Sequence, residues 1–190
     1  MARERKFTKK KLYQTTKEAL LEYSYAGFTF RIVAERLHIA RGTLYKYYEN
    51  KDELITDYMV EEMNHFLNEL HKINTYKNFE DQFDYLLYII FKDREIHQIR
   101  EMTYQIPTEI NEKVKANKVQ LDKQHQTMYA TLQHFVQLGK TENLLNPTLP
   151  DSLILGFIFQ TIDIPNHASI PYSQWVSSIK TMLTHGIFTN

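Results

Sequence analysis

Cationic, hydroxyl-bearing and small residues gather in one short segment, RGTLYKYYENK, which spans Arg41–Lys51. Arg41 and Lys46 carry donors that suit guanine acceptors or phosphates, and Thr43 offers a methyl group for thymine and a hydroxyl group. Gly42 has no side chain, so the backbone there can approach a ligand closely. These residue types at this spacing favour contact with a nucleic acid.

Neighbouring residues suit phosphate contacts. Tyr47 can donate its hydroxyl group to a phosphate, and Lys51 lies at an expected helix start, where free N–H groups and the helix dipole favour an anion. Thr29, at the start of an earlier helix, can serve a second phosphate in the same way. Each residue alone is more often an ordinary exposed polar side chain, but the full set predicts a DNA-contacting surface: Thr29, Arg41, Gly42, Thr43, Tyr45, Lys46, Tyr47 and Lys51.

The hydrophobic pattern predicts the helices that position this set. We expect helices over about 8–23, from Thr29 to about residue 37, and over about 41–47. In the third, Leu44 and Tyr48 face inward, and Gly42, Thr43, Lys46 and Tyr47 face away. His38 falls in the turn between the second and third helices, where a positive φ is expected, and we interpret it as a turn residue and not a metal ligand. This is the layout of a helix-turn-helix, whose second helix enters the major groove of DNA.

The charge distribution supports this interpretation. The 190-residue chain has a net charge of zero, but residues 1–51 hold 12 Lys or Arg and only 5 Asp or Glu. The remaining residues are therefore acidic overall. A basic head on an acidic body suggests that the head alone meets a polyanion. The alternative is a solvated basic tail.

Composition excludes several other classes. Cysteine is absent, so neither a disulfide framework nor a thiolate metal site is expected. The basic N-terminus is not followed by the apolar run of a secretory signal, and no segment is apolar for long enough to span a membrane. We therefore expect a cytoplasmic protein without membrane contact.

The rest of the chain is helical in pattern. Further helices are expected at about 51–71, 79–90, 96–103, 110–139, 151–164 and 173–188. The predicted fold is all-α, with about nine helices. A helix-turn-helix DNA-binding domain would occupy residues 1–50, and a helical regulatory and dimerisation domain would occupy residues 51–190.

One of these helices predicts self-association. The run LILGFIF, residues 153–159, is apolar on nearly all sides, and such a helix must be covered on two faces. One face can meet the core of the chain, and the other can pair with a second copy together with the last helix. The predicted homodimer interface contains Leu153, Phe157, Trp175 and Ile179. The alternative is a fully buried central helix in a monomer.

A ligand site is less clearly marked. Asn117 and His125 interrupt the apolar stripe of the long helix at 110–139, and polar groups inside a helical body are costly unless they are paired. They would either contact a small-molecule ligand or lie on a part of the helix that projects into solvent. Candidate ligand-binding residues are Tyr88, Tyr104, Asn117, His125, Met128 and Phe157, although aromatic residues at helical spacing are more often plain core.

Enzymatic interpretations find little support. The 8 histidines are scattered, and neither an HExxH motif nor a Gly-rich phosphate loop is present. We expect no enzymatic activity, no metal site and no cofactor.

The head resembles the DNA-binding domain of the TetR family of bacterial repressors without a gap. The run GTLYKYYENKDEL is the sharpest part of the match, which is carried by Leu12, Tyr25, Thr29, Arg31, Ala34, Gly42, Thr43, Leu44, Tyr45, Tyr47, Lys51, Glu53 and Leu54. The resemblance implies an all-α homodimer with a ligand pocket in the body and pairing of the last two helices. Three residues depart from the family pattern: Ser24 and His38 stand where glycine is usual, and Ala40 replaces the serine that caps the third helix and touches a phosphate.

The predicted function is a sequence-specific transcriptional regulator, most simply a repressor. It would bind a palindromic double-stranded operator as a homodimer and leave it when a small apolar effector binds. One alternative is a ligand-independent architectural DNA-binding protein. Another is an adaptor that uses its body for protein–protein contacts.

Overall fold

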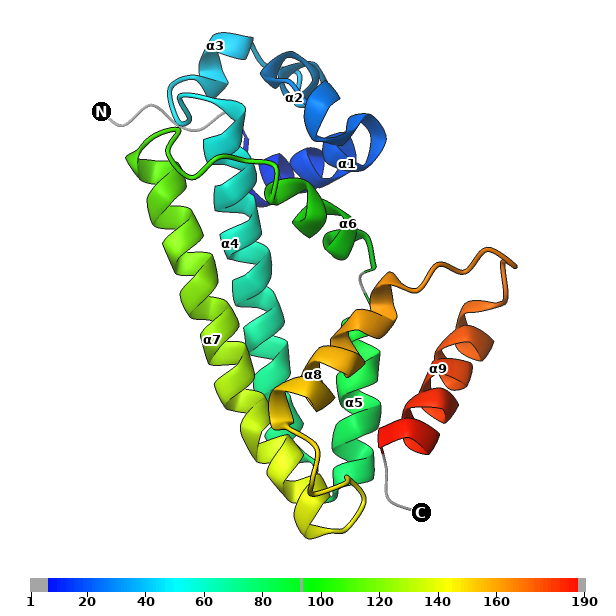
Figure 1. Ribbon diagram of the computed structural model, residues 1–190. Helices are drawn as coiled ribbons and strands as arrows, with labels where there is room; N and C mark the ends of the chain where they lie inside the picture. Colours follow the sequence, from blue (N-terminus) through cyan, green and yellow to red (C-terminus); the bar gives the residue numbers. More distant parts are fainter. Residues whose placement is uncertain (1–6, 93, 188–190) are drawn as a thin grey trace. The chain divides into compact units, whose positions relative to one another are not determined.

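All regular structure in the described residues, 7–92 and 94–187 of the computed structural model, is helical (Figure 1). This confirms the predicted all-α class. The elements are α1 (Lys9–Gly27), α2 (Phe30–Arg36), α3 (Arg41–Leu44), α4 (Lys51–Leu70), η1 (His71–Thr75), α5 (Phe79–Lys92), α6 (Arg94–Thr103), α7 (Glu112–Thr141), α8 (Asp151–Gln160), η2 (Thr161–Asp163) and α9 (Tyr172–Ile187). Residues 1–6 lie outside the described residues. Phe188, at which the last helix is predicted to end, also lies outside them.

The chain forms two compact units, and neither is a continuous stretch of sequence. The first contains Met1–Asn64 and Glu95–Asp122, and the second contains His65–Arg94 and Lys123–Asn190. The first unit therefore holds the three N-terminal helices, the first part of α4, α6 and the beginning of α7. The functional division predicted at residue 50 stays a prediction.

Helix α1 contains a break close to its predicted end. Thr8 caps its start, because its hydroxyl oxygen accepts a hydrogen bond from Lys11 N at 3.1 Å. At Ser24 the backbone has φ 56° and ψ 178°, a conformation that residues other than glycine rarely adopt. The predicted helix end at about residue 23 coincides with this break, and one further turn follows it.

The core of the first unit joins segments that are distant in sequence. Side chains from the N-terminal helices and from α4 pack in one cluster, among them the fully buried Leu12, Leu44 and Leu54. Ile99 of α6 and Val114 of α7 are buried in the same cluster. The helix-turn-helix therefore shares its hydrophobic core with residues some 50–100 positions away.

The second unit is centred on α5. The rings of Phe79 and Phe135 stack with centroids 4.7 Å apart, and Phe83 stacks on Phe79 at 5.9 Å. Gly139 allows this packing, since a Cβ atom there would lie 2.5 Å from the Phe79 ring. No helix in the described part of the chain is long and apolar enough to cross a membrane.

Helices α8 and α9 divide their apolar residues between the core and the surface. In α8, Ile154, Leu155 and Ile158 are buried, whereas Leu153 and Phe157 are 58% and 52% exposed. Within this single chain, α8 is therefore covered on one face only.

The prediction for α9 needs a correction. Ile179 is 3% exposed, because α9 packs against α5, where Lys180 also forms an ion pair with Asp84. Ile179 belongs to the core of the second unit and does not lie on an exposed face. Trp175 is half-buried.

Candidate nucleic-acid interface

Helix α2 and the turn after it have the conformations that the sequence predicts. Thr29 is extended, and its hydroxyl oxygen accepts a hydrogen bond from Ile32 N at 3.4 Å, as expected of an N-cap. His38 has a φ of 53°, which confirms the positive φ expected in the turn. A hydrogen bond from Ile39 N to the Ala34 carbonyl, 3.0 Å long, closes this turn.

Helix α3 is shorter than predicted. Its α-helical part ends at Leu44, and residues 45–47 continue as turns. In these turns Lys46 N bonds to the Thr43 carbonyl at 3.3 Å and Tyr47 N bonds to the Leu44 carbonyl at 2.9 Å, which is i to i+3 pairing. The segment keeps helix-like sidedness while its last turn tightens. Residues 41–47 are called the recognition segment below.

The recognition segment has one buried side and one exposed side. Leu44 is fully buried, and Tyr48 is buried with its hydroxyl group donating to Asp57 Oδ2 at 2.7 Å. Gly42 and Lys46 are exposed, as the helical pattern predicts. No heavy atom lies within 4 Å of the position that a Cβ atom would take on Gly42, so the backbone there is open to an approaching partner.

Arg41 rests on an aromatic support. Its Nη2 donates to the Tyr45 hydroxyl group at 2.7 Å, and its guanidinium carbon lies 5.2 Å from the centre of the Tyr45 ring. Tyr45 in turn packs edge-on against the buried Phe30, with ring centroids 5.0 Å apart. Tyr45 therefore orients Arg41 while most of the guanidinium donors stay available.

Thr43 and Tyr47 are less exposed than predicted. Both are half-buried, and the Tyr47 ring packs edge-on against Phe7 with centroids 5.7 Å apart.

The start of α3 lacks a side-chain cap, because Ala40 is extended but has no acceptor in its side chain.

Lys51, at the start of α4, already has partners within the chain. Its Nζ donates to the Tyr25 carbonyl at 2.7 Å and lies 4.1 Å from the centre of the Tyr25 ring. The Tyr25 hydroxyl group donates to Asp52 Oδ1 at 2.8 Å. Burial, together with this hydrogen bond, raises the pKa of Tyr25 to about 12. The last turn of α1 thus holds Lys51 in place.

A second carboxylate fixes the end of the recognition segment. Asp57 Oδ2 accepts hydrogen bonds from the hydroxyl groups of Tyr13 and Tyr48, both at 2.7 Å. Burial and the hydrogen bond to Asp57 raise the pKa of Tyr13 well above its usual value. Tyr48, which directly follows the recognition segment, is therefore fixed to α4 through Asp57, and the same carboxylate also binds Tyr13 of α1.

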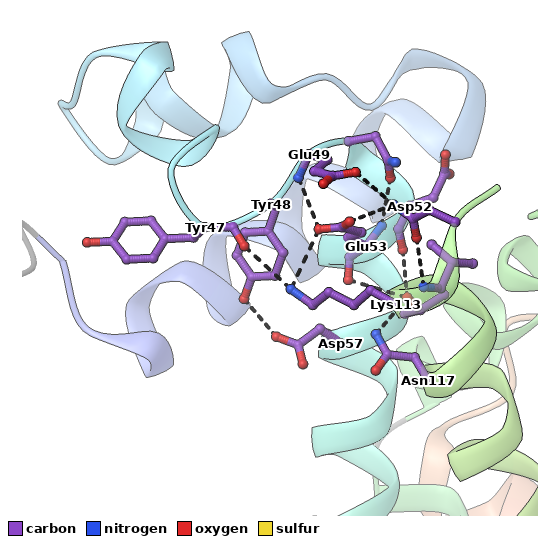
Figure 2. Close-up of polar contacts among 12 residues, drawn as sticks. Tyr47, Tyr48, Glu49, Asp52, Glu53, Asp57, Lys113 and Asn117 are labelled. Carbon is purple, nitrogen blue, oxygen red and sulfur yellow. Dashed lines mark hydrogen bonds and ion pairs between the residues drawn. The ribbon is translucent and has the colours of Figure 1, made fainter.

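Sequence reasoning missed a polar cluster that joins this region to the start of α7 (Figure 2). Asn111 Nδ2 donates to Glu53 Oε1 at 2.6 Å and to Glu49 Oε2 at 3.2 Å, and Lys113 Nζ lies 3.6 Å from Glu53 Oε2. Asn117, predicted as a ligand contact, donates to the Thr56 hydroxyl oxygen at 3.0 Å. An asparagine just before an apolar helical pattern could have indicated the cap of α7, but no local pattern identifies its partners.

The predicted ligand residues are divided between the two units. Tyr104 and Asn117 belong to the first unit, and Tyr88, His125, Met128 and Phe157 belong to the second. Tyr88 and Tyr104 are 57% and 68% exposed, whereas Met128 is buried and His125 is half-buried. Neither unit by itself assembles the predicted set, and the lining of a ligand site stays a prediction.

The fold and the recognition segment define a helix-turn-helix protein of the DNA-binding kind. Residues 12–58 match the family model described as "Bacterial regulatory proteins, tetR family". This head is therefore a DNA-binding domain of the TetR type, and the chain is a DNA-binding transcriptional regulator.

Solved structures share the fold. The ketosteroid transcriptional regulator KstR2 of Mycobacterium tuberculosis is 16% identical, with a TM-score of 0.69 over 100% of this chain and 98% of that one. FadR from Bacillus subtilis, in complex with stearoyl-CoA, is 17% identical, with a TM-score of 0.67 over 95% and 100%. A putative regulator from Saccharomonospora viridis, in complex with choline, is 11% identical, with a TM-score of 0.75 over 95% and 97%. A search of the curated proteins finds no match.

Proposed function

We propose that this regulator is an operator-binding repressor whose recognition segment reads bases in the major groove. The observation that carries the proposal is the sidedness of this segment. Leu44 and Tyr48 anchor it in the core, while Arg41, the open backbone at Gly42, and Lys46 face outward. Arg41 and Lys46 would contact guanine edges or phosphates, and the half-buried Thr43 would contact a base through its methyl or hydroxyl group.

Phosphate contacts would fix the register of this segment on the duplex. Thr29 lies at the start of α2, and Lys51 lies in the first turn of the 20-residue helix α4. Lys51 is held by Tyr25, so it can meet a phosphate without a large loss of side-chain entropy. Tyr47 would add a hydroxyl group beside them, and Tyr45 would act mainly by orienting Arg41.

The protein would bind DNA as a homodimer. Leu153 and Phe157 are four residues apart on the uncovered face of α8, and Met182 of α9 is likewise exposed. Exposed apolar side chains of this size on α8 and α9 support a symmetric interface. Two recognition segments would then read the two halves of a palindrome, about 34–36 Å apart.

The proposed switch is a small apolar or amphipathic effector bound by the C-terminal helices. Two structures with this fold are complexes with choline and with stearoyl-CoA, which supports a ligand-responsive role for this chain. Effector binding would lower operator affinity by about 5–150-fold, the usual range of such coupling.

Selection of operators from a random double-stranded DNA library tests the proposal. The expected product is an inverted repeat with half-sites one helical turn apart. Small molecules that raise the melting temperature would then be titrated against the protein on this operator. Loss of operator binding supports the ligand-released repressor. Stabilisation without any change in operator affinity favours a ligand-independent DNA-binding protein, and failure to select any DNA sequence favours the adaptor.

A further inference from the structure

The segment that joins the recognition segment to α4 is held by residues from far along the chain. The Tyr47 carbonyl accepts a hydrogen bond from Lys113 Nζ at 3.4 Å, and this ammonium group lies 4.3 Å from the centre of the Tyr48 ring. Glu49 N donates to Glu53 Oε2 at 3.0 Å. Backbone groups of a short connection are thereby bonded to side chains of α4 and α7.

Glu53 is the centre of this arrangement. Its side chain is 4% exposed, and a carboxylate removed from water to this degree needs partners for its charge. Asn111 donates to one carboxylate oxygen. Lys113 approaches the other (Figure 2). Asn50 Oδ1 accepts from Glu53 N at 2.9 Å, which caps α4 and fixes the backbone beneath the carboxylate.

Asn111 is itself rigidly held. Its Oδ1 accepts a hydrogen bond from Val114 N at 2.9 Å and so caps α7, and Val114 is fully buried in the core of the first unit. With the oxygen committed to the cap, the amide nitrogen must point toward Glu53 and Glu49. The first turn of α7 is therefore in a position to control the geometry of the connection.

We propose that Asn111 and Lys113 are positioning residues for operator reading, which act through Glu53 and the Tyr47 carbonyl. This inference rests on the proposed function, because it assumes that the recognition segment reads bases. In this arrangement Lys113 serves the connection and contacts no phosphate. Accurate placement of Lys46 and Tyr47 on DNA then depends on residues more than 60 positions further along the chain.

Two pairs of variants separate positioning from stability and from charge. Asn111→Ser keeps an acceptor that caps α7 but removes the amide donor, whereas Asn111→Asp keeps the cap and places a second carboxylate against Glu53. Lys113→Met removes the ammonium group but keeps an apolar stem beside Tyr48. Lys115→Met is its matched control, since Lys115 is on the same helix and makes a 4.0 Å ion pair with the exposed Glu109.

The first measurement is binding to the selected operator and to random duplex DNA at several salt concentrations, well below the melting temperature. Asn111→Ser and Lys113→Met should weaken operator binding by about 2–30-fold and Asn111→Asp by at least as much. Binding to random DNA should change less than twofold, because it depends on charge and not on fine placement. The salt slope should stay the same, Lys113→Arg should restore affinity, and Lys115→Met should have no effect.

The second measurement needs no DNA. Hydrogen exchange at the Glu49 amide of the full-length protein should be faster in Asn111→Ser than in the unmodified chain. Unchanged exchange and unchanged operator affinity would overturn the inference, as would a reduced salt slope in Lys113→Met, which would make Lys113 a phosphate contact. Equal affinity of the unmodified protein for operator and random DNA would refute the proposed function. The exchange measurement would still decide whether Asn111 fixes the connection at Glu49.

Discussion

Replacement of Lys51 by methionine should separate two roles that the structure gives to one side chain. The ammonium group bonds to the Tyr25 carbonyl at 2.7 Å and lies 4.1 Å from the Tyr25 ring. A hydrogen bond from a charged donor contributes about 1.5–3 kcal/mol and a partly exposed cation–π contact about 0.5–1 kcal/mol, but Lys51 is half-buried and methionine keeps the stem. We therefore expect Lys51→Met to lower the free energy of unfolding by about 1–2 kcal/mol.

The effect on DNA binding is of a different kind. Each phosphate neutralised contributes about 0.9 to the slope of log affinity against log salt. A dimer carries the substitution in both heads, so the slope should fall by about 1.8, and the loss of affinity between 50 and 200 mM salt should shrink by about 12-fold. Operator and random DNA should be affected alike, because a phosphate carries no sequence information.

Fluorescence anisotropy with a labelled operator, repeated over this salt range, measures the slope, and a urea titration measures the stability. Lys51→Arg is the control, since it keeps the charge. A stability loss with an unchanged salt slope would show that Lys51 only fastens the last turn of α1 to α4, and would refute its assignment as a phosphate contact.

Three further predictions follow from particular residues. Ser24→Gly should raise the free energy of unfolding by about 1 kcal/mol in a urea titration, because glycine adopts the backbone conformation found at Ser24 without strain; no gain would mean that the break in α1 is unstrained. The pKa of Tyr25 is about 12 in the folded protein, above its ordinary value of 10, so Tyr25 stabilises the fold fully below pH 10 and loses this contribution as pH rises toward 12; Tyr25→Phe should flatten the stability profile in that window, and an unaltered profile would contradict this cause. Phe157→Asp places a charge on the exposed face of α8 and should give monomers with weak operator binding in light scattering, whereas a monomeric unmodified protein at micromolar concentration would remove the basis for the dimer.

The local features of the head were predictable because local chemistry determines them. The cap at Thr29, the positive φ at His38, and the burial of Leu44 and Tyr48 all follow from residue type and helical periodicity, and all are confirmed. The length of α3 was not predictable in the same way, because its last turn is tightened by i to i+3 hydrogen bonds that no side-chain pattern encodes.

Long-range contacts account for the remaining differences. Nothing in the sequence near Glu53 indicates that Asn111, 58 residues away, is its hydrogen-bond partner. Ile179 was assigned to a dimer interface because an apolar residue on a helix fits an interface and a core equally well, and the packing of α9 against α5 decides for the core. Tyr88 was a candidate pocket residue for its ring alone, but in the structure it lies exposed beside Tyr85, with ring centroids 6.2 Å apart.

The most direct test of the central claim is the base preference of variants in the recognition segment. Thr43→Ala and Lys46→Ala would be titrated against the selected operator, against single-base variants of it and against random duplex DNA. If the recognition segment reads bases, each variant should lose about 1–3 kcal/mol of discrimination at particular operator positions and bind random DNA nearly as before. Equal losses of affinity for operator and random DNA in both variants would contradict the account, because the recognition segment would then only attach the protein to the DNA backbone.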